Sequence, residues 1–336
     1  MWNPIFWTTY FNVMKHYAHP KKDLWTGRVS NKWLYLHEKA HCTPLEELPE
    51  AQKKSIALLG YACDEGVRRN QGRVGAVDGP DIIKNSFGKM PNHLGSNVLL
   101  HDVGSVVCSD GDMESAQNQL TETVTTLLEK KQFPIVLGGG HDMAYGHYNG
   151  IKKYLDAKKE GQTIGIINFD AHFDLRKNTE QSNSGTPFYQ IAKDCEKEGL
   201  DFNYLCLGIR KDANDRNLFQ TAKELDVIYV MNDTFQIPLL NEITTWINAF
   251  AKNVDHIYVT IDLDGFSSAY APGVSAPSPM GFSPYMVLEC LKTIIGSGKL
   301  ISIDIAEMNP KYDVDGQTAK LAASLVHHVA HSVSGS

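Results

Sequence analysis

Short apolar runs alternate with longer amphipathic segments along most of this chain. Most of the short runs are nearly continuous in Ile, Val, Leu and Tyr, which is typical of strands that are covered on both faces in a parallel sheet. We therefore expect eight strands, at residues 55–62, 97–103, 133–137, 163–169, 204–208, 226–230, 256–261 and 300–305.

Four segments between these runs carry apolar residues at helical spacing. In the first, Leu120, Val124 and Leu127 share one stripe, and Pro284 suits the first turn of the third. Strands that alternate with helices predict a doubly wound α/β fold, in which ligands bind beyond the carboxyl ends of the strands. The expected helices are residues 113–131, 143–158, 284–295 and 315–331.

Length and composition favour one large domain. The chain has 336 residues, of which 42% are hydrophobic, and this is enough for a substantial core. We expect residues 55–331 to form a single α/β domain and residues 1–54 to form a polar, aromatic-rich extension packed on it.

The composition also excludes several kinds of partner and location. A formal net charge of -7 gives the chain no bulk attraction for nucleic acid or for an anionic membrane. The sequence contains no window of about 18 apolar residues that could span a membrane, and its N-terminus is a poor signal peptide. None of the six cysteines forms a C-x-x-C pair, which favours a reducing compartment, so we expect a cytoplasmic protein.

Four of the expected strands are followed or closed by a motif of acidic and histidine side chains. Three glycines let the backbone turn tightly before the histidine of the first motif. Alternate residues of an extended chain share one face, so the side chains of the second and third motifs can converge. The motif residues are, in chain order, His141; Asp170, His172 and Asp174; Asp262 and Asp264; and Asp304 and Glu307.

Each motif alone is more often a cap, a turn or a surface pair than a metal site. Two carboxylates that flank a histidine would repel each other in an apolar site unless a cation is present. Because several carboxylates and two imidazoles are expected at adjacent strand ends, a pair of divalent metal ions is the simplest way to neutralise them. The ligands are hard and no cysteine takes part, which favours Mn²⁺ over Zn²⁺. Two ions roughly 3.5–4 Å apart can bridge one water and lower its pKa, which gives hydroxide at neutral pH.

The motifs GGGH, DAHFD, DLD and AEMNP, in this order, resemble the ureohydrolase superfamily, which includes arginase and agmatinase. The similar region runs from about residue 56 to the C-terminus. This resemblance implies a three-layer α/β/α sandwich with an eight-stranded, mostly parallel sheet, as in the arginase fold, and two Mn²⁺ per chain. It also implies a set of ligands, in which His141 and Asp174 serve one ion, His172 and Asp264 serve the other, and Asp170 and Asp262 bridge both.

Within the superfamily, several segments are similar to the formimidoylglutamase branch. These segments are LWTGRVS, DEGVRRNQGRVGA, GGGHDMAYGHY, SNSGTPF and APGVSAP. Arginases carry a histidine in the loop after DAHxD, whereas this loop reads NTEQSNSGTPF, which counts against arginine as the substrate. The resemblance implies hydrolysis of N-formimidoyl-L-glutamate to L-glutamate and formamide, a step of histidine degradation.

Two alternatives remain open for the function. The chain could be another ureohydrolase that releases urea from a guanidino substrate such as agmatine or guanidinobutyrate. It could also be a catalytically silent metal-binding homologue, although all six expected ligands and Glu307 are present. Relatives of the arginase type are often trimers or hexamers, so a homo-oligomer is a further expectation.

The resemblance also suggests roles for residues around the metal ligands. Glu307 is expected to hold the cationic formimino nitrogen by a charge-assisted hydrogen bond, with Asp170 and Asp262 completing the catalytic set. Asp304 is a candidate for orienting a ligand. The two substrate carboxylates require positive or hydrogen-bonding groups, although each arginine is equally suited to a structural ion pair. The candidates are Arg73 first, then Asn183, Ser184, Gly185 and Thr186, and then Arg210.

Overall fold

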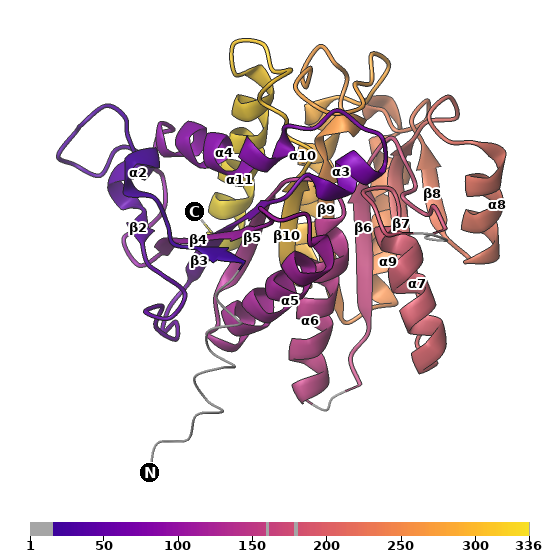
Figure 1. The fold of residues 1–336 in the computed structure, drawn as a ribbon, viewed down its shortest axis with the longest axis horizontal. Coiled ribbons are helices and arrows are strands. Elements are labelled where there is room, and N and C mark those ends of the chain that lie inside the picture. The colour runs from indigo at the N-terminus through magenta and orange to yellow at the C-terminus, as the bar shows by residue number, and fades with distance from the viewer. Residues whose placement is uncertain (1–15, 159–160, 178–180, 336) are drawn as a thin grey trace.

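A computed structural model describes residues 16–158, 161–177 and 181–335 of the chain. Its centre is a sheet in the order β1-β4-β3-β5-β10-β9-β6-β7-β8, with β2 paired to β4 (Figure 1). The pairing of β1 with β4 is antiparallel, and the other strand pairs of the described residues are parallel. The strands are β1 Tyr17–Ala18, β2 His41–Cys42, β3 Ser55–Ala62, β4 Leu99–Val107, β5 Phe133–Gly138, β6 Ile164–Phe169, β7 Asn203–Ile209, β8 Ile228–Met231, β9 His256–Asp262 and β10 Leu300–Ala306.

The eight expected strands correspond to β3 through β10, so the prediction of a mostly parallel α/β sheet is confirmed. The two additional strands, β1 and β2, are two residues long each and carry no periodic signal that a sequence pattern could reveal. The expected helices are also present, with α6 at the expected bounds and α11 beginning two residues later and ending three residues later than expected. The helices are α2 Leu36–Lys39, α3 Glu65–Arg69, α4 Gly79–Gly88, α5 Met113–Glu129, α6 Met143–Lys158, α7 Pro187–Glu198, α8 Arg216–Glu224, α9 Leu240–Lys252, α10 Pro284–Gly296 and α11 Gln317–Ser334.

Helices cover both faces of the sheet, which makes three layers (Figure 1). One apolar cluster joins the sheet to α4, α9, α10 and α11, and a second joins it to α5, α6, α7 and α8. Along β3, Ile56 and Leu58 belong to the first cluster, whereas Ala57 and Leu59 belong to the second. Because side chains alternate between the faces of a strand, a strand buried on both faces must be apolar throughout, as these runs are.

Local sequence signals explain where several helices begin. The side chain of Asp112 accepts a hydrogen bond from the backbone N–H of Ser115 at 3.0 Å and so caps α5. Ser283 caps α10 in the same way, and Pro284 occupies its first turn, as the sequence predicted. None of the helices in the described residues has the length and apolar character needed to cross a membrane.

The described part of the N-terminal region, residues 16–54, contacts the edge of the sheet through β1 and β2. A buried polar contact fixes it further, because the indole N–H of Trp25 donates to Asp102 Oδ2 at 2.9 Å. The other oxygen of Asp102 pairs with Lys84 Nζ at 2.6 Å, and both charged side chains are fully enclosed. Residues 1–15 of the expected extension lie outside the described residues, and the division of the chain at residue 55 stays a prediction.

Candidate metal centre

The four motifs follow four strands that are neighbours in the middle of the sheet, β5, β10, β9 and β6. In the register of these strands, Leu137 pairs with Ile305, Ala306 with Asp262, and Phe169 with Ile261. The carboxyl ends of the four strands therefore lie at one level. Segments separated by more than 160 residues, such as the loops that carry His141 and Glu307, meet there, and His141 N donates to Glu307 Oε1 at 3.0 Å.

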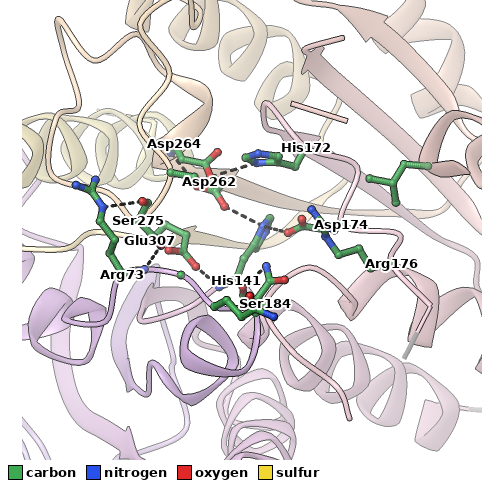
Figure 2. A pocket seen from close by; sticks show the side chains of 15 residues that line it. Arg73, His141, His172, Asp174, Arg176, Ser184, Asp262, Asp264, Ser275 and Glu307 are labelled. Carbon is green, nitrogen blue, oxygen red and sulfur yellow. Dashed lines mark hydrogen bonds and ion pairs between the residues drawn. The ribbon is translucent and has the colours of Figure 1, made fainter. Parts of the chain in front are cut away.

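The first group of expected ligands surrounds His141 Nδ1. This atom lies 2.9 Å from Asp174 Oδ2 and 3.1 Å from Asp262 Oδ2 (Figure 2). It also lies 3.3 Å from Asp170 Oδ2. His141 and Asp170 are almost completely buried. We refer to these four residues as the His141 group.

The second group surrounds His172 Nδ1, which lies 3.2 Å from Asp264 Oδ2 and 3.5 Å from Asp170 Oδ1. We call these three residues the His172 group. Within each group, the candidate ligand atoms all lie within 4.8 Å of one another. Asp170 contributes one oxygen to each group, as expected of a bridging ligand. Asp262 belongs to the His141 group, and its Oδ1 accepts the backbone N–H of Asp264 at 2.8 Å.

The electrostatics of the site fit a bound cation. Burial raises the pKa of Asp264 and Glu307 well above the usual carboxyl range, and the neighbouring charge of Asp262 raises both further. Burial alone would lower the pKa of His141, but hydrogen bonds with Asp170, Asp174 and Asp262 outweigh it and raise the pKa. Burial and neighbouring charge thus oppose the ionisation of Asp264 and Glu307, and three carboxylates draw a proton onto the buried imidazole of His141.

Unpaired polar atoms give a second, independent test of that fit. Asp264 Oδ1 and Glu307 Oε2 are buried without a hydrogen-bond partner among the described residues. Such atoms are costly unless another group satisfies them. Carboxylate oxygens and imidazole nitrogens are ligands that suit Mn²⁺. The residues therefore form a candidate site for two divalent cations.

The backbone is unusual at two of these positions. Asp174 has φ 49° and Glu307 has φ 69°, the left-handed region that side chains other than glycine rarely adopt. Glu307 is held there because its N–H donates to Gly139 O at 2.8 Å. Strain of this kind persists where the surrounding structure fixes it, and it concentrates at functional sites.

The glycines before His141 are required by a close approach of two strands. A Cβ at Gly139 would lie 2.2 Å from the carbonyl oxygen of Cys63 and 2.5 Å from that of Tyr61. The N–H of Gly140 donates to Cys63 O at 2.8 Å. The sequence prediction of a tight turn with close backbone approach is therefore confirmed.

A cavity of about 500 Å³ opens above the two groups. Five of the six expected ligands reach its wall, together with Glu307, Arg73 and Ser184. Several other residues that the sequence did not indicate also line it. These additional residues are Asn70, Gln71, Gly72, Arg176, Leu218, Ser275 and Ala276.

Arg73 lies at the cavity, but two of its guanidinium nitrogens hold backbone carbonyls. Its Nε donates to Ser275 O at 2.9 Å, and its Nη2 donates to Val274 O at 2.6 Å. The guanidinium also lies 3.8 Å from the centre of the Tyr312 ring. Arg73 therefore joins three loops as well as facing the cavity.

Of the other expected substrate contacts, Ser184 is the one that lines the cavity, where its hydroxyl accepts from Asn70 Nδ2 at 3.1 Å. Asn183 Oδ1 accepts the N–H of Gly185 at 2.9 Å, and Thr186 donates to Asn183 O at 2.9 Å, so their polar groups hold the loop together.

The arginine that lines the cavity beside Ser184 is not the one that the sequence suggested. Arg210 pairs with Asp212 at 2.6 Å and is not among the residues that line the cavity. Arg176, which the sequence analysis missed, lines the cavity, and its backbone N–H donates to Gly185 O at 2.9 Å. The alternation that connects Asp170, His172 and Asp174 continues to residue 176, and this signal could have found it.

A model of the arginase family matches residues 54–331. The chain belongs to the arginase family. Its curated relatives include formimidoylglutamases, and the resemblance to this branch is confirmed. The formimidoylglutamase of Aeromonas salmonicida is 42% identical over 309 residues, which cover 92% of this chain and 95% of the relative. That of Chromobacterium violaceum is 43% identical over 302 residues, which cover 90% of this chain and 95% of the relative.

Solved structures share the fold. Formimidoylglutamase from Bacillus subtilis has a TM-score of 0.74 at 24% identity, with 87% of this chain and 92% of that chain covered. Trypanosoma cruzi formiminoglutamase with Mn²⁺ also has a TM-score of 0.74, at 23% identity, with 87% and 98% covered. These likenesses confirm the expected three-layer arginase fold.

Proposed function

We propose that this chain is a formimidoylglutamase, which hydrolyses N-formimidoyl-L-glutamate to L-glutamate and formamide in histidine degradation. One observation carries the proposal: two overlapping groups of carboxylates and imidazoles lie at the floor of a cavity, with Asp170 in both groups. The curated relatives that match nearly the whole chain bear the name of this activity. The alternation of Asp170, His172 and Asp174 in one loop supports a shared site.

We propose Mn²⁺ as the metal, with one ion in each group and Asp170 and Asp262 as bridging ligands. When bound, a pair of Mn²⁺ ions would lower the pKa of a water molecule held between them. The carboxylates of the two groups have the charge and the spacing to hold that pair. The floor of the cavity then presents the water to the formimino carbon of a substrate.

Glu307 is the proposed contact for the cationic formimino group. Its Oε1 accepts the backbone N–H of His141 at 3.0 Å, which leaves Oε2 without a partner beside the cavity. A carboxylate in this position holds a cationic nitrogen by a charge-assisted hydrogen bond. Such a contact would also orient the carbon toward the floor of the cavity, where Asp170 and Asp262 would hold the metal pair.

Arg176 is the proposed contact for a substrate carboxylate. Its side chain is exposed at the cavity wall and makes no hydrogen bond with the other described residues. A planar guanidinium suits a carboxylate because it can donate two parallel hydrogen bonds. Arg73 is a second candidate through Nη1, the nitrogen that holds neither of its two carbonyl partners. The hydroxyl of Ser184 completes the polar wall. The remaining loop candidates, Asn183, Gly185 and Thr186, are proposed to support these contacts by shaping the loop, whereas Arg210 pairs with Asp212 away from the cavity.

A substrate panel tests the proposal. The protein is stripped of metal, loaded with Mn²⁺ and incubated with formimidoylglutamate, arginine and agmatine, and formamide and urea are measured side by side. We expect formamide from formimidoylglutamate and little urea from the other two. Urea release from a guanidino compound would replace the proposal with another ureohydrolase activity. Absence of any product, with no bound Mn²⁺, would indicate a silent homologue.

We also propose a cytoplasmic location, because the six cysteines are free thiols. A homo-oligomer stays a prediction, which sedimentation of the Mn²⁺-loaded protein would test.

A further inference from the structure

We propose that Thr260 and Asp304 are positioning residues that determine which nitrogen of His141 carries a proton and which faces the metal. The inference rests on the proposed function only in requiring that the site binds metal. Thr260 lies on β9 and Asp304 on β10, and both side chains are fully buried beneath the His141 group.

The direction of each hydrogen bond follows from what each group can donate. Thr260 Oγ1 lies 2.5 Å from Asp304 Oδ1, and His141 Nε2 lies 2.8 Å from Thr260 Oγ1. An ionised carboxylate only accepts, so the single hydroxyl proton of Thr260 points to Asp304. The hydroxyl oxygen must then accept, and His141 carries a proton on Nε2. Nδ1, the atom that faces the carboxylates of the His141 group, is then the ring nitrogen that can give up its proton and bind a metal.

Asp304 is itself held in place at its other oxygen. Oδ2 accepts from the hydroxyl of Tyr258 and from His147 Nδ1, the latter at 2.6 Å. His147 Nε2 lies 2.7 Å from Ser302 Oγ. These side chains are all buried, and they join β9, β10 and α6 beneath the site.

The chain of contacts continues to the backbone of a fourth element. The hydroxyl of Ser302 donates to Pro134 O, at 3.0 Å, in β5. Since that proton is used, Ser302 Oγ accepts from His147 Nε2. Tyr258 and Thr260 donate to opposite oxygens of Asp304, which keeps the carboxylate from rotating and from turning away from Thr260. The polar chain thus runs from a carbonyl in β5 to the candidate ligand, with Asp304 as its central acceptor.

This arrangement affects affinity as well as orientation. A carboxylate that acts through a hydroxyl on an imidazole N–H makes the opposite nitrogen a better ligand, and such outer contacts typically change metal affinity by about 10- to 100-fold. In the His172 group, by contrast, Nε2 of His172 makes no hydrogen bond within the described residues. The proposal therefore predicts that one of two metal positions depends on Thr260.

Substitution of Thr260 by Val tests the inference, because valine keeps the shape of threonine and removes the hydroxyl. Thr260→Ser retains the hydroxyl and serves as the rescue variant. Thr123→Val is the matched control, because Thr123 is equally buried on α5 and donates to Gln119 O at 2.8 Å, away from the site. Mn²⁺ binding to the metal-free full-length proteins is followed by calorimetry and by the electron paramagnetic resonance of free Mn²⁺.

In Thr260→Val we expect one Mn²⁺ to bind about 10- to 100-fold more weakly and the other to keep its affinity. Thr260→Ser and Thr123→Val should bind both ions as the wild type does. Wild-type affinity for both ions in Thr260→Val would overturn the inference. So would an equal loss in Thr260→Ser, since that result would assign the effect to packing.

A second variant covers the case in which Thr260→Val does not fold. Asp304→Asn keeps the shape but removes the charge that directs the hydroxyl, and it should weaken the same ion; unchanged affinity would overturn the inference. Formamide release is measured on the same wild-type samples. Wild-type protein that binds two Mn²⁺ and forms no formamide would contradict the proposed function and leave this inference intact.

Discussion

The two ligand groups differ in how the protein supports them. The His141 ring is enclosed, packs edge-on against Phe188 with ring centres 5.4 Å apart, and has Thr260 behind it. The side chain of His172 is 23% exposed and faces the cavity, and its ring pairs with carboxylates of the described residues. The difference teaches that one candidate metal position is built into the sheet, whereas the other is open to the cavity.

The comparison has a chemical consequence. A ligand fixed by the core loses little freedom when a metal binds, so its affinity is built in during folding. A ligand at the cavity wall can adjust as a substrate arrives. Asp170 connects the fixed His141 group to the more exposed His172 group because it contributes an oxygen to each. The following experiments test the contrast between the two groups, in order of expected effect.

Removing the shared candidate ligand, Asp170, should abolish metal binding in both groups at once. Asp170→Ala is expected to lose both Mn²⁺ ions and nearly all formamide release, because it removes charge from both groups, and Asp262→Ala should behave similarly. Metal content by elemental analysis and the formamide assay check this. Asp212→Ala is the matched control, since Asp212 pairs with Arg210 outside the cavity. Near-normal activity in Asp170→Ala would break the ligand assignment.

One carboxylate oxygen of Glu307 accepts the backbone N–H of His141, and the other lies at the cavity. Glu307→Gln should keep the first contact and lose the charge at the second, and we expect kcat/KM to fall roughly 10- to 100-fold. Mn²⁺ content should remain at two ions per chain. If the metal is lost together with activity, Glu307 acts on the ligands and not on the substrate.

The cavity wall beside the His172 group should bind a substrate carboxylate through Arg176. Arg176→Ala is expected to raise KM for formimidoylglutamate roughly 10-fold or more and to change kcat and Mn²⁺ content little, because a charged hydrogen bond is lost. Arg210→Ala is the control, since its guanidinium pairs with Asp212. A KM that rises in Arg73→Ala but not in Arg176→Ala would move the carboxylate contact to the other side of the cavity.

The contrast between the histidines themselves can be measured without metal. His141→Ala should lower the free energy of unfolding of the metal-free protein by about 1–3 kcal/mol, because Thr260 loses its donor and a buried space opens. His172→Ala should change it by a few tenths of a kcal/mol, about the size of effect that surface substitutions have. Chemical denaturation in the presence of a chelator gives both values. Equal losses of unfolding free energy in the two variants would show that the protein supports the two histidines equally.

The smallest expected effect concerns how folding stability depends on pH at His101, a buried histidine outside the candidate site. Burial lowers the pKa of His101, on β4, from 6.5 to about 4, with His41 nearby. The folded protein then binds fewer protons than the unfolded chain in this window, so stability falls as the pH drops from 6.5 to 4.

The metal-free His101→Gln variant should lose less thermal stability than the wild type between pH 7 and 4.5, measured by melting temperature. His19→Gln, at a histidine whose side chain is 55% exposed, is the control. An unchanged pH dependence in His101→Gln would assign the acid sensitivity to other groups.

The sequence predicted the strands well because strands buried on both faces must be apolar at every position. It could not predict β1 and β2, which pair for two residues each and owe their conformation to β4. Six helices of the described residues, α2, α3, α4, α7, α8 and α9, were also not predicted. In α8, for example, Leu218 and Ala222 are the buried apolar residues, too few to stand out as a stripe.

At the site, the ligands were predictable because their spacing matches an extended loop. The wall of the cavity was not, because it depends on which loops meet. Arg73 contacts Ser275, which lies about 200 positions further along the chain. Arg210 pairs instead with Asp212, two residues further along the chain. Thr260 carries no sequence signal, because a threonine in an apolar strand is ordinary and its role depends on β10 lying alongside.

The order of the sheet has a consequence for synthesis. β9 and β10 lie between β5 and β6, so the middle of the sheet comes from the last third of the chain. A nascent chain that ends before residue 256 has the outer strands of both flanks but nothing to join them. Neither Asp262 nor Asp264 exists until β9 has been synthesised, after the strands on both sides of it. The full set of candidate ligands therefore forms only after both flanks of the sheet have been made.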